Sequence, residues 1–172
     1  MLMASPIQAQ EARFTDDALK AQILKGPARF ESFAAGIILG YGKGRGVDAE
    51  GVEAYLAVER TKIRVREMRS LMLADLDGDG LVRPAEIAVL MSGEGTRGRG
   101  RLWQRYVAAD RDGDGDVSFA EMRDQSQIVV AKELSARETE VVRSLMLMDQ
   151  DQDGYVTTLE LRAFLLVLAP QT

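Results

Sequence analysis

The chain has 172 residues, of which 46% are hydrophobic and 28% are charged, enough for one globular domain or two small lobes. It contains neither cysteine nor histidine, which excludes disulfides, thiolate zinc sites and hydrolytic triads that depend on histidine. The formal net charge is −5. No run of apolar residues is long enough to cross a bilayer, so we expect no membrane span.

Residues 1–14 are expected to form an irregular tail or the remnant of a signal peptide. Met1–Ala9 places small and apolar residues before a polar stretch, as at the end of a secretory signal peptide, with Ile7–Ala9 as the cleavage triplet. The basic start and long apolar run of such a peptide are missing. The pattern favours export, to a periplasm or the medium, over a cytoplasmic location, and an accidental likeness is the alternative.

A helical pattern begins at Thr15, where Asp16 and Asp17 suit the positive end of the helix dipole. The pattern breaks at Gly26-Pro27 and then resumes. The apolar residues that mark its second part are Phe30, Phe33, Ile37 and Ile38.

The next segment, Gly40–Gly51, is rich in glycine and carries Lys43 and Arg45. Glycines beside basic residues can cradle phosphate, but the Gly-Lys-Ser/Thr ending and the preceding strand of a P-loop are absent. Residues 52–74 then contain neither Gly nor Pro and carry a basic stripe at Arg60–Arg69. Such a stripe can bind lipid or nucleic acid. A solvated helix face is the simpler interpretation, and we expect no nucleic-acid partner.

Three twelve-residue segments repeat one arrangement of oxygen ligands. Aspartate occupies positions 1, 3 and 5, glycine position 6, valine position 8 and glutamate position 12. A hard divalent cation takes roughly six to eight oxygens, which these side chains and the position-7 carbonyl supply, while glycine permits the sharp turn. The predicted ligands are Asp75, Asp77, Asp79, Leu81 and Glu86; Asp110, Asp112, Asp114, Asp116 and Glu121; and Asp149, Asp151, Asp153, Tyr155 and Glu160.

On these residues the sequence resembles the EF-hand superfamily, and is similar to its multi-hand members of the calmodulin type. The resemblance implies an all-α fold of four EF-hand helix-loop-helix units paired into two lobes, three bound Ca²⁺ ions, and no enzymatic reaction. Acidic surface turns are the simpler alternative, but turns do not require a glutamate six residues after the glycine three times over. A lanthanide binder is a further alternative, because trivalent ions share these ligands. Lanthanide-selective EF hands carry proline at position 2, where this chain has Leu76, Arg111 and Gln150, so the sequence favours calcium.

The fourth unit is found by extending the repeat backwards. The acidic loops begin at residues 75, 110 and 149, and a step of 35 residues before the first reaches Gly40. Val47 then falls at position 8, while glycine replaces the ligands at positions 1, 3, 5 and 12. We interpret Gly40–Gly51 as a degenerate hand without metal; a glycine-rich linker is the alternative. Loops of a pair meet at position 8, which predicts Val47 beside Val82 and Val117 beside Val156.

The boundary between the lobes is expected at residues 93–100, where four glycines indicate a linker. This gives an N-terminal pair over residues 15–92 and a C-terminal pair over residues 101–170. Leu102, Trp103, Tyr106 and Val107 form a helical stripe that enters the Asp110 loop, so the single tryptophan should report on metal binding.

Position 9 of each loop should begin the helix that follows. Ser118 and Thr157 have capping-box spacing to the glutamates at position 12. Arg83 occupies this position in the Asp75 loop, where it has no acceptor atom and carries a charge that opposes a bound cation. We therefore expect the Asp75 site to be the weakest of the three.

Two classes of function remain open at this stage. The first is a monomeric calcium sensor whose helices open on loading and present an apolar, methionine-containing groove to a protein partner. The second is a calcium buffer, or a structural protein stabilised by calcium without a switch. Three Ca²⁺ ions would change the net charge from −5 to about +1, which favours the sensor. The methionines suit a groove or an ordinary core; they are Met68, Met72, Met91, Met122, Met146 and Met148.

Overall fold

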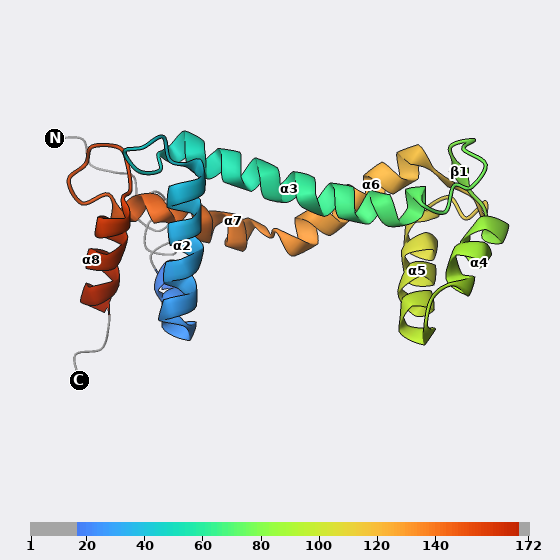
Figure 1. Cartoon of the computed structure of the whole chain (residues 1–172), viewed down its shortest axis with the longest axis horizontal. Helices are drawn as coiled ribbons and strands as arrows, with labels where there is room; N and C mark the ends of the chain where they lie inside the picture. The colour runs from blue at the N-terminus through green and yellow to red at the C-terminus, as the bar shows by residue number, and fades with distance from the viewer. Residues whose placement is uncertain (1–16, 169–172) are drawn as a thin grey trace. The chain divides into compact units, whose positions relative to one another are not determined.

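The computed structural model describes residues 17–168, and these residues form the predicted all-α fold with one short two-stranded ladder (Figure 1). Two compact units are present. Glu59–Ser135 forms one, which we call the central unit. Residues 17–58 together with residues 136–168 form the other, the terminal unit. The central unit is one continuous segment, whereas the terminal unit is assembled from two distant parts of the chain.

The terminal unit begins with a helix at residues 17–25, which buries Leu19 and Ile23. Gly26 interrupts the helix and Pro27 starts α2 (Pro27–Tyr41), as the sequence predicts, because proline tolerates the first helical turn but not its interior. The first part of α3 (Ala49–Met72) follows. The second segment of the unit supplies α7 (Ala136–Arg143), the 3₁₀ helix η1 (Ser144–Met148) and α8 (Thr158–Leu168), and α8 packs against α2.

The central unit contains the rest of α3, β1 (Leu81–Val82), α4 (Pro84–Ser92), α5 (Thr96–Ala109), β2 (Val117–Ser118) and α6 (Phe119–Glu133). These elements surround one apolar core. Its buried members are Leu71, Ala74, Val82, Ile87, Leu102, Tyr106, Ala109, Val117 and Met122. Burial of this apolar surface is the main force that holds the short helices together.

The four loops pair in a different order from the predicted one. We number them loop 1 (Gly40–Gly51), loop 2 (Asp75–Glu86), loop 3 (Asp110–Glu121) and loop 4 (Asp149–Glu160). Val82 lies opposite Val117 in the antiparallel ladder of β1 and β2, and Val47 bridges Val156 through hydrogen bonds of 2.9 and 2.8 Å. Loop 2 therefore pairs with loop 3, and loop 1 with loop 4. The predicted contacts of Val47 with Val82 and of Val117 with Val156 are wrong.

The unbroken helix α3 gives the physical reason for this order. It has 24 residues and contains no turn, so the chain between loops 1 and 2 does not fold back on itself. In contrast, α4 and α5 are joined by a short turn, which keeps loops 2 and 3 together. Because all four loops carry valine at position 8, that residue does not choose among partners, and the connecting segments decide.

The predicted linker at residues 93–100 is also largely wrong, because α5 begins at Thr96 and includes Gly98 and Gly100. Glycine in a helix costs about 1 kcal/mol relative to alanine. Burial of Leu102 and Tyr106 on the same helix offsets this cost, so tertiary packing overrides the local propensity. The compact units consequently do not follow the expected lobes at residues 15–92 and 101–170.

The predicted tail, the signal-like triplet and the helix start at Thr15 lie outside the described residues. Within residues 17–168, every helix is too short or too polar to cross a membrane.

Candidate metal sites

The glutamate at position 12 is folded over each acidic loop by the same two hydrogen bonds. In loop 3, Glu121 Oε1 accepts the N–H of Arg111 at 3.0 Å and Oε2 accepts that of Ser118 at 2.9 Å. The matching distances are 2.8 and 2.9 Å for Glu86, and 2.9 and 2.9 Å for Glu160. Positions 2 and 9 thus hold the last carboxylate near the first.

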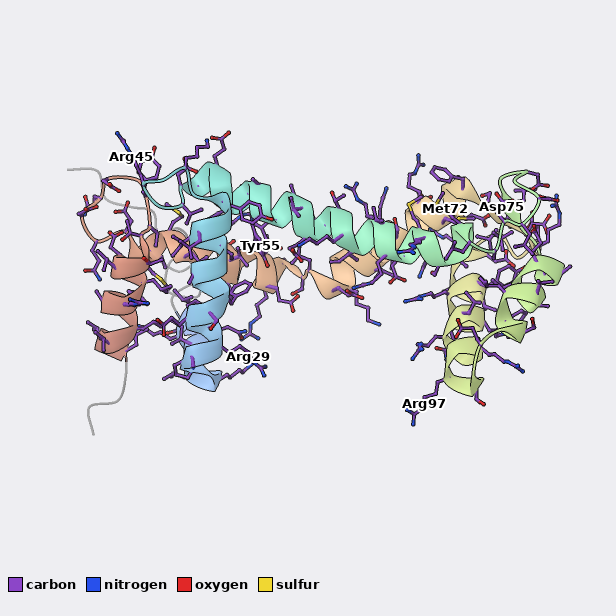
Figure 2. The ribbon with its side chains drawn as sticks, viewed as in Figure 1. Arg29, Arg45, Tyr55, Met72, Asp75 and Arg97 are labelled. Atoms are coloured by element: carbon purple, nitrogen blue, oxygen red, sulfur yellow. The ribbon has the colours of Figure 1, made fainter. Side chains whose placement is uncertain are left out.

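The aspartate at position 1 is also turned inward by backbone donors. Asp75 accepts the N–H groups of Gly78 and Gly80 at 2.8 and 3.1 Å. Asp110 accepts the N–H of Gly113 at 2.9 Å, and Asp149 accepts that of Gly154 at 3.0 Å. The glycines at position 6 have φ values of 86, 88 and 87°, a left-handed conformation that favours glycine. Asp75 lies just after Met72 and the end of α3 in Figure 2.

These bonds bring together the side chains of positions 1, 3 and 12. In each loop one carboxylate oxygen from each of the three residues lies within 4.8 Å of the other two. Oxygens that share an ion at about 2.3–2.6 Å must be this close. The three groups are Asp75, Asp77 and Glu86; Asp110, Asp112 and Glu121; and Asp149, Asp151 and Glu160.

The aspartates at position 5 are outside these groups. Asp79, Asp114 and Asp153 each accept the N–H of position 7, at 2.8–2.9 Å. In loop 4, Asp149 Oδ1 is buried and has no hydrogen-bond partner. A buried carboxylate oxygen without a partner is costly, and a cation beside it would remove that cost. The donor set and this oxygen therefore fit a divalent cation.

Comparison with known proteins agrees with this geometry. Residues 107–124 and 142–165 match the family model of the EF hand. These two stretches are therefore EF hands. We call each loop with its flanking helices a hand and give the hand its loop's number. The two matched stretches contain the carboxylate groups of hands 3 and 4, and hand 2 has the same group and the same internal hydrogen bonds. The comparisons with curated proteins and with solved structures gave no match.

Hydrogen bonds keep the position-12 glutamates ionised, the state that binds metal. The backbone N–H groups of Arg83 and Leu76 lower the pKa of Glu86. Partial burial is the largest single influence on the pKa of Glu121 and Glu160 and acts upward. The hydrogen bonds to the N–H and hydroxyl groups of position 9 and to the N–H groups of positions 2 and 3 together outweigh it, and the net shift of the pKa is downward. Ser118 and Thr157 also accept the N–H of these glutamates, at 3.3 and 3.2 Å, which confirms both predicted capping boxes.

Hand 1 keeps the pairing positions of an EF hand and lacks the ligands. Val47 is fully buried and Val52, at position 13, is almost so, as are the equivalent residues Ile87, Met122 and Leu161. At position 12, a Cβ on Gly51 would lie only 2.7 Å from the carbonyl oxygen of Tyr41, so the backbones approach too closely for a glutamate. Among the described residues, loop 1 contains no cluster of three carboxylates close enough to share a metal ion.

In both loop pairs an arginine of one loop contacts a residue of the other loop. These contacts were not predicted from the sequence because the predicted pairing of the loops was wrong. The guanidinium of Arg45 in hand 1 lies 5.8 Å from the ring centroid of Tyr155 in hand 4, and Arg45 is labelled in Figure 2. Arg83 in hand 2 lies 3.7 Å from a carboxylate oxygen of Asp116 in hand 3. Tyr155 and Asp116 both occupy position 7 of their loops.

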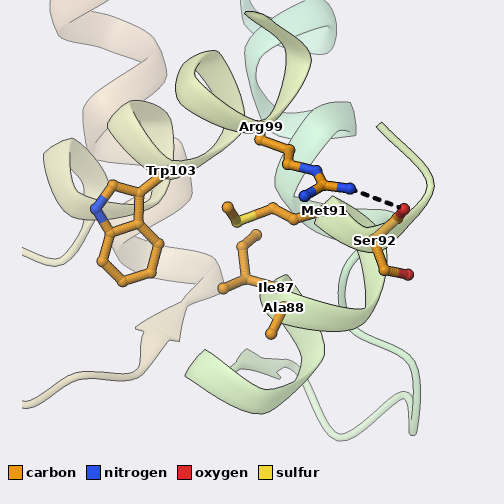
Figure 3. Close-up of a pocket in the computed structure, with 6 residues that line it drawn as sticks. All are labelled: Ile87, Ala88, Met91, Ser92, Arg99 and Trp103. Carbon is orange, nitrogen blue, oxygen red and sulfur yellow. Dashed lines mark hydrogen bonds between the residues drawn. The ribbon is translucent and has the colours of Figure 1, made fainter. Parts of the chain in front are cut away.

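The central unit has an apolar pocket of about 340 Å³ between α4 and α5 (Figure 3). Its lining residues are Ile87, Ala88, Met91, Ser92, Arg99 and Trp103. Trp103 is 46% exposed and its ring centroid lies 5.4 Å from that of Tyr106. The Tyr106 hydroxyl donates to the carbonyl of Gly115 in loop 3. One chain of contacts thus joins the pocket to a metal-ligand loop.

Proposed function

We propose that this EF-hand protein binds three calcium ions, in loops 2, 3 and 4, and none in loop 1. The observation that carries the proposal is the grouping of position-1, -3 and -12 carboxylates in all three acidic loops. The position-5 aspartates and the carbonyls of Leu81, Asp116 and Tyr155 would complete each oxygen shell. Calcium, when bound, supplies two positive charges that neutralise the clustered carboxylates. The protein would act by binding and not by catalysis.

Calorimetry and native mass spectrometry test the number of ions. We expect three ions per wild-type chain and two in each of the single variants Glu86→Gln, Glu121→Gln and Glu160→Gln. Glutamine keeps the size of the side chain but removes the charge and one anionic oxygen, so it is a matched change at each loop. A fourth specific ion would contradict the metal-free assignment of hand 1, and a variant that still binds three would contradict the assignment of its loop.

For the central unit we propose a sensor role that depends on the α4–α5 pocket. Tyr106 contacts both Trp103 in the pocket and Gly115 in loop 3, so loading of that loop has a direct route to the pocket. The pocket lining is apolar and includes Met91, which suits a flexible hydrophobic contact. Arg97, Arg99, Arg101 and Arg105 follow on α5. A partner peptide with an apolar anchor and acidic flanks fits this surface.

The alternative is a buffer or a calcium-stabilised structural protein. One observation favours it: the metal-free loops already hold their glutamates inward through backbone hydrogen bonds, so loading requires little rearrangement. A calcium titration with a hydrophobic dye, read together with Trp103 fluorescence, distinguishes the two roles. Dye binding that appears only with calcium supports the sensor. Full calcium occupancy with a flat dye signal and an unchanged tryptophan spectrum supports the buffer.

A further inference from the structure

Arg83 lies at position 9 of loop 2, at the start of α4, and faces the ligands of its own loop. Its Nη1 atom is 2.6 Å from Asp79 Oδ2 and 3.7 Å from Asp77 Oδ2. Its Nε atom is 3.7 Å from Asp116 Oδ2 in the paired loop 3. One guanidinium therefore contacts three carboxylates from two hands. The Arg83 side chain is 38% exposed, so it has room to move away from the loop.

The oxygens that Arg83 contacts are the ones the loop leaves open. Asp77 Oδ1 accepts the N–H of Asp79 at 3.2 Å, and Asp79 Oδ1 accepts the N–H of Leu81 at 2.9 Å. The second oxygen of each aspartate faces the guanidinium instead of a backbone donor. A metal ion in loop 2 would need oxygens from these same two residues. Arginine and metal thus compete for the same carboxylates.

Asp116 differs from the other two partners of Arg83. It occupies position 7 of loop 3, where the backbone carbonyl and not the side chain is the predicted ligand. Its carboxylate is consequently free to pair with Arg83 whether or not loop 3 holds a metal. If the guanidinium leaves Asp77 and Asp79, Asp116 remains as a partner already within 3.7 Å of Nε.

Loops 3 and 4 have no arginine at position 9 that could compete with a metal ion. Ser118 and Thr157 occupy position 9 and donate their hydroxyls to Glu121 and Glu160, both at 2.8 Å. Among the described residues, no lysine or arginine forms an ion pair with the aspartates at positions 3 and 5 of these loops. The competing cation is specific to hand 2.

We propose that Arg83 is a tethered cation that competes with calcium for Asp77 and Asp79, and that Asp116 of the paired hand receives it when calcium binds. This inference rests on the proposed function, since it concerns one of the three proposed sites. It makes hand 2 the site that needs the highest calcium concentration. Hand 2 of the metal-free protein is also the one whose carboxylates are already partly neutralised.

The test is a site-resolved NMR calcium titration of Arg83→Ala, followed through the amides of Gly80, Gly115 and Gly154. Arginine provides no side-chain acceptor for the cap of α4, so alanine removes the charge without removing a cap. We expect the midpoint at Gly80 to fall roughly fivefold, as the loss of an exposed but close charge pair would give. The midpoint at Gly154 should not change.

Arg111→Ala is the matched control. Arg111 is exposed at position 2 of loop 3, and it forms no ion pair with another described residue, so its removal changes the net charge of the same unit equally. We expect it to leave the Gly80 midpoint within about twofold of wild type. Arg83→Lys keeps the cation and should keep the weak site. A Gly80 midpoint that is no lower in Arg83→Ala than in Arg111→Ala would overturn the inference.

A second measurement concerns the metal-free protein and does not depend on loading. In chelator, Arg83→Ala should melt slightly below wild type, because three carboxylates lose their counter-charge, whereas Arg111→Ala should not. An Arg83→Ala variant that melts above wild type in chelator would overturn the role of Arg83 as a counter-charge to the three carboxylates. If no glycine amide responds to calcium in any variant, the proposed function fails together with the inference; if all three respond and Arg83→Ala changes nothing, only the inference fails.

Discussion

The central and terminal units each contain one pair of loops, and they differ in how many of these loops carry a group of carboxylates. The central pair joins loops 2 and 3, both acidic, whereas the terminal pair joins the glycine-rich loop 1 with the acidic loop 4. Both pairs nevertheless place valine opposite valine at position 8 and bury an apolar residue at position 13. Pairing and metal binding therefore depend on different positions of the same twelve-residue motif, and one can be lost while the other is kept.

The largest expected difference between the units is their response to calcium removal. A site saturated about 100-fold above its dissociation constant stabilises the folded state by roughly 2.7 kcal/mol. Two independent sites would stabilise the central unit by about 5 kcal/mol, and one site would stabilise the terminal unit by half as much. Chelator should thus lower the melting temperature of the central unit more.

Each unit has its own probe for this experiment. Trp103 fluorescence follows the central unit, and exchange of the Val156 amide, which donates to Val47 at 2.8 Å, follows the terminal unit. Equal shifts in the two probes would mean that the units unfold together. A larger loss in the terminal unit would contradict the assignment of two sites to the central one.

A second prediction concerns position 12, where hand 1 has Gly51 and the other hands have glutamate. A Cβ at Gly51 would lie 2.7 Å from the Tyr41 oxygen and 2.8 Å from Val47 Cγ2. Gly51→Ala should therefore destabilise the terminal unit by about 2 kcal/mol through overpacking, measured by urea unfolding. Gly40→Ala is the control, because Gly40 lies in α2 with open space around a Cβ, and alanine there should be neutral or stabilising. Equal effects of the two variants would show that loop 1 is a loose linker.

The metal-ligand groups and most helices were predictable from sequence because they depend on local spacing. The break at Gly26-Pro27 and the capping box of Ser118 with Glu121 follow from the conformational preferences of those residues. The alternation of Asp residues fixes the ligand order of loops 2, 3 and 4 in the same way. Local rules suffice wherever the partner lies within the same motif.

The pairing of the loops could not be predicted by the same rules. Valine at position 8 is common to all four loops, so it carries no information about partners. The signal that was present lies in the connecting segments: residues 52–74 contain neither Gly nor Pro, which is consistent with the single helix α3. The glycines at residues 93–100 were misleading, since packing of Leu102 and Tyr106 holds α5 together. The contact of Arg83 with Asp116 joins loops 2 and 3, so it could not be predicted without their pairing.

A third prediction addresses the two hands of the central unit. Arg83→Ser removes the competing cation and adds a hydroxyl that can cap α4, as Ser118 caps α6. The cap should stabilise the unit by about 1 kcal/mol, and the Gly80 amide should respond at lower calcium than in wild type. Comparison with Arg83→Ala separates the two contributions, because only serine supplies the cap. A melting temperature in chelator that is the same for both variants would exclude a capping effect.

The smallest expected difference between the units is their response to acid without metal. The pKa values of Glu86, Asp79 and Glu121 in the central unit are lowered, and so is that of Glu160 in the terminal unit. A carboxylate whose pKa is lower when folded adds stability above its unfolded pKa, near 4.3 for glutamate, and loses it as the pH falls through the folded value. In chelator, both units should lose stability below about pH 4.3, and the central unit should lose more because it holds more such groups. Protonation also relieves repulsion among the clustered aspartates, an effect of the opposite sign. Thermal melts between pH 7 and pH 3, followed by Trp103 and by the Val156 amide, decide which effect is larger. A central unit that becomes more stable in acid would mean that the repulsion outweighs the hydrogen bonds that fold the glutamates inward.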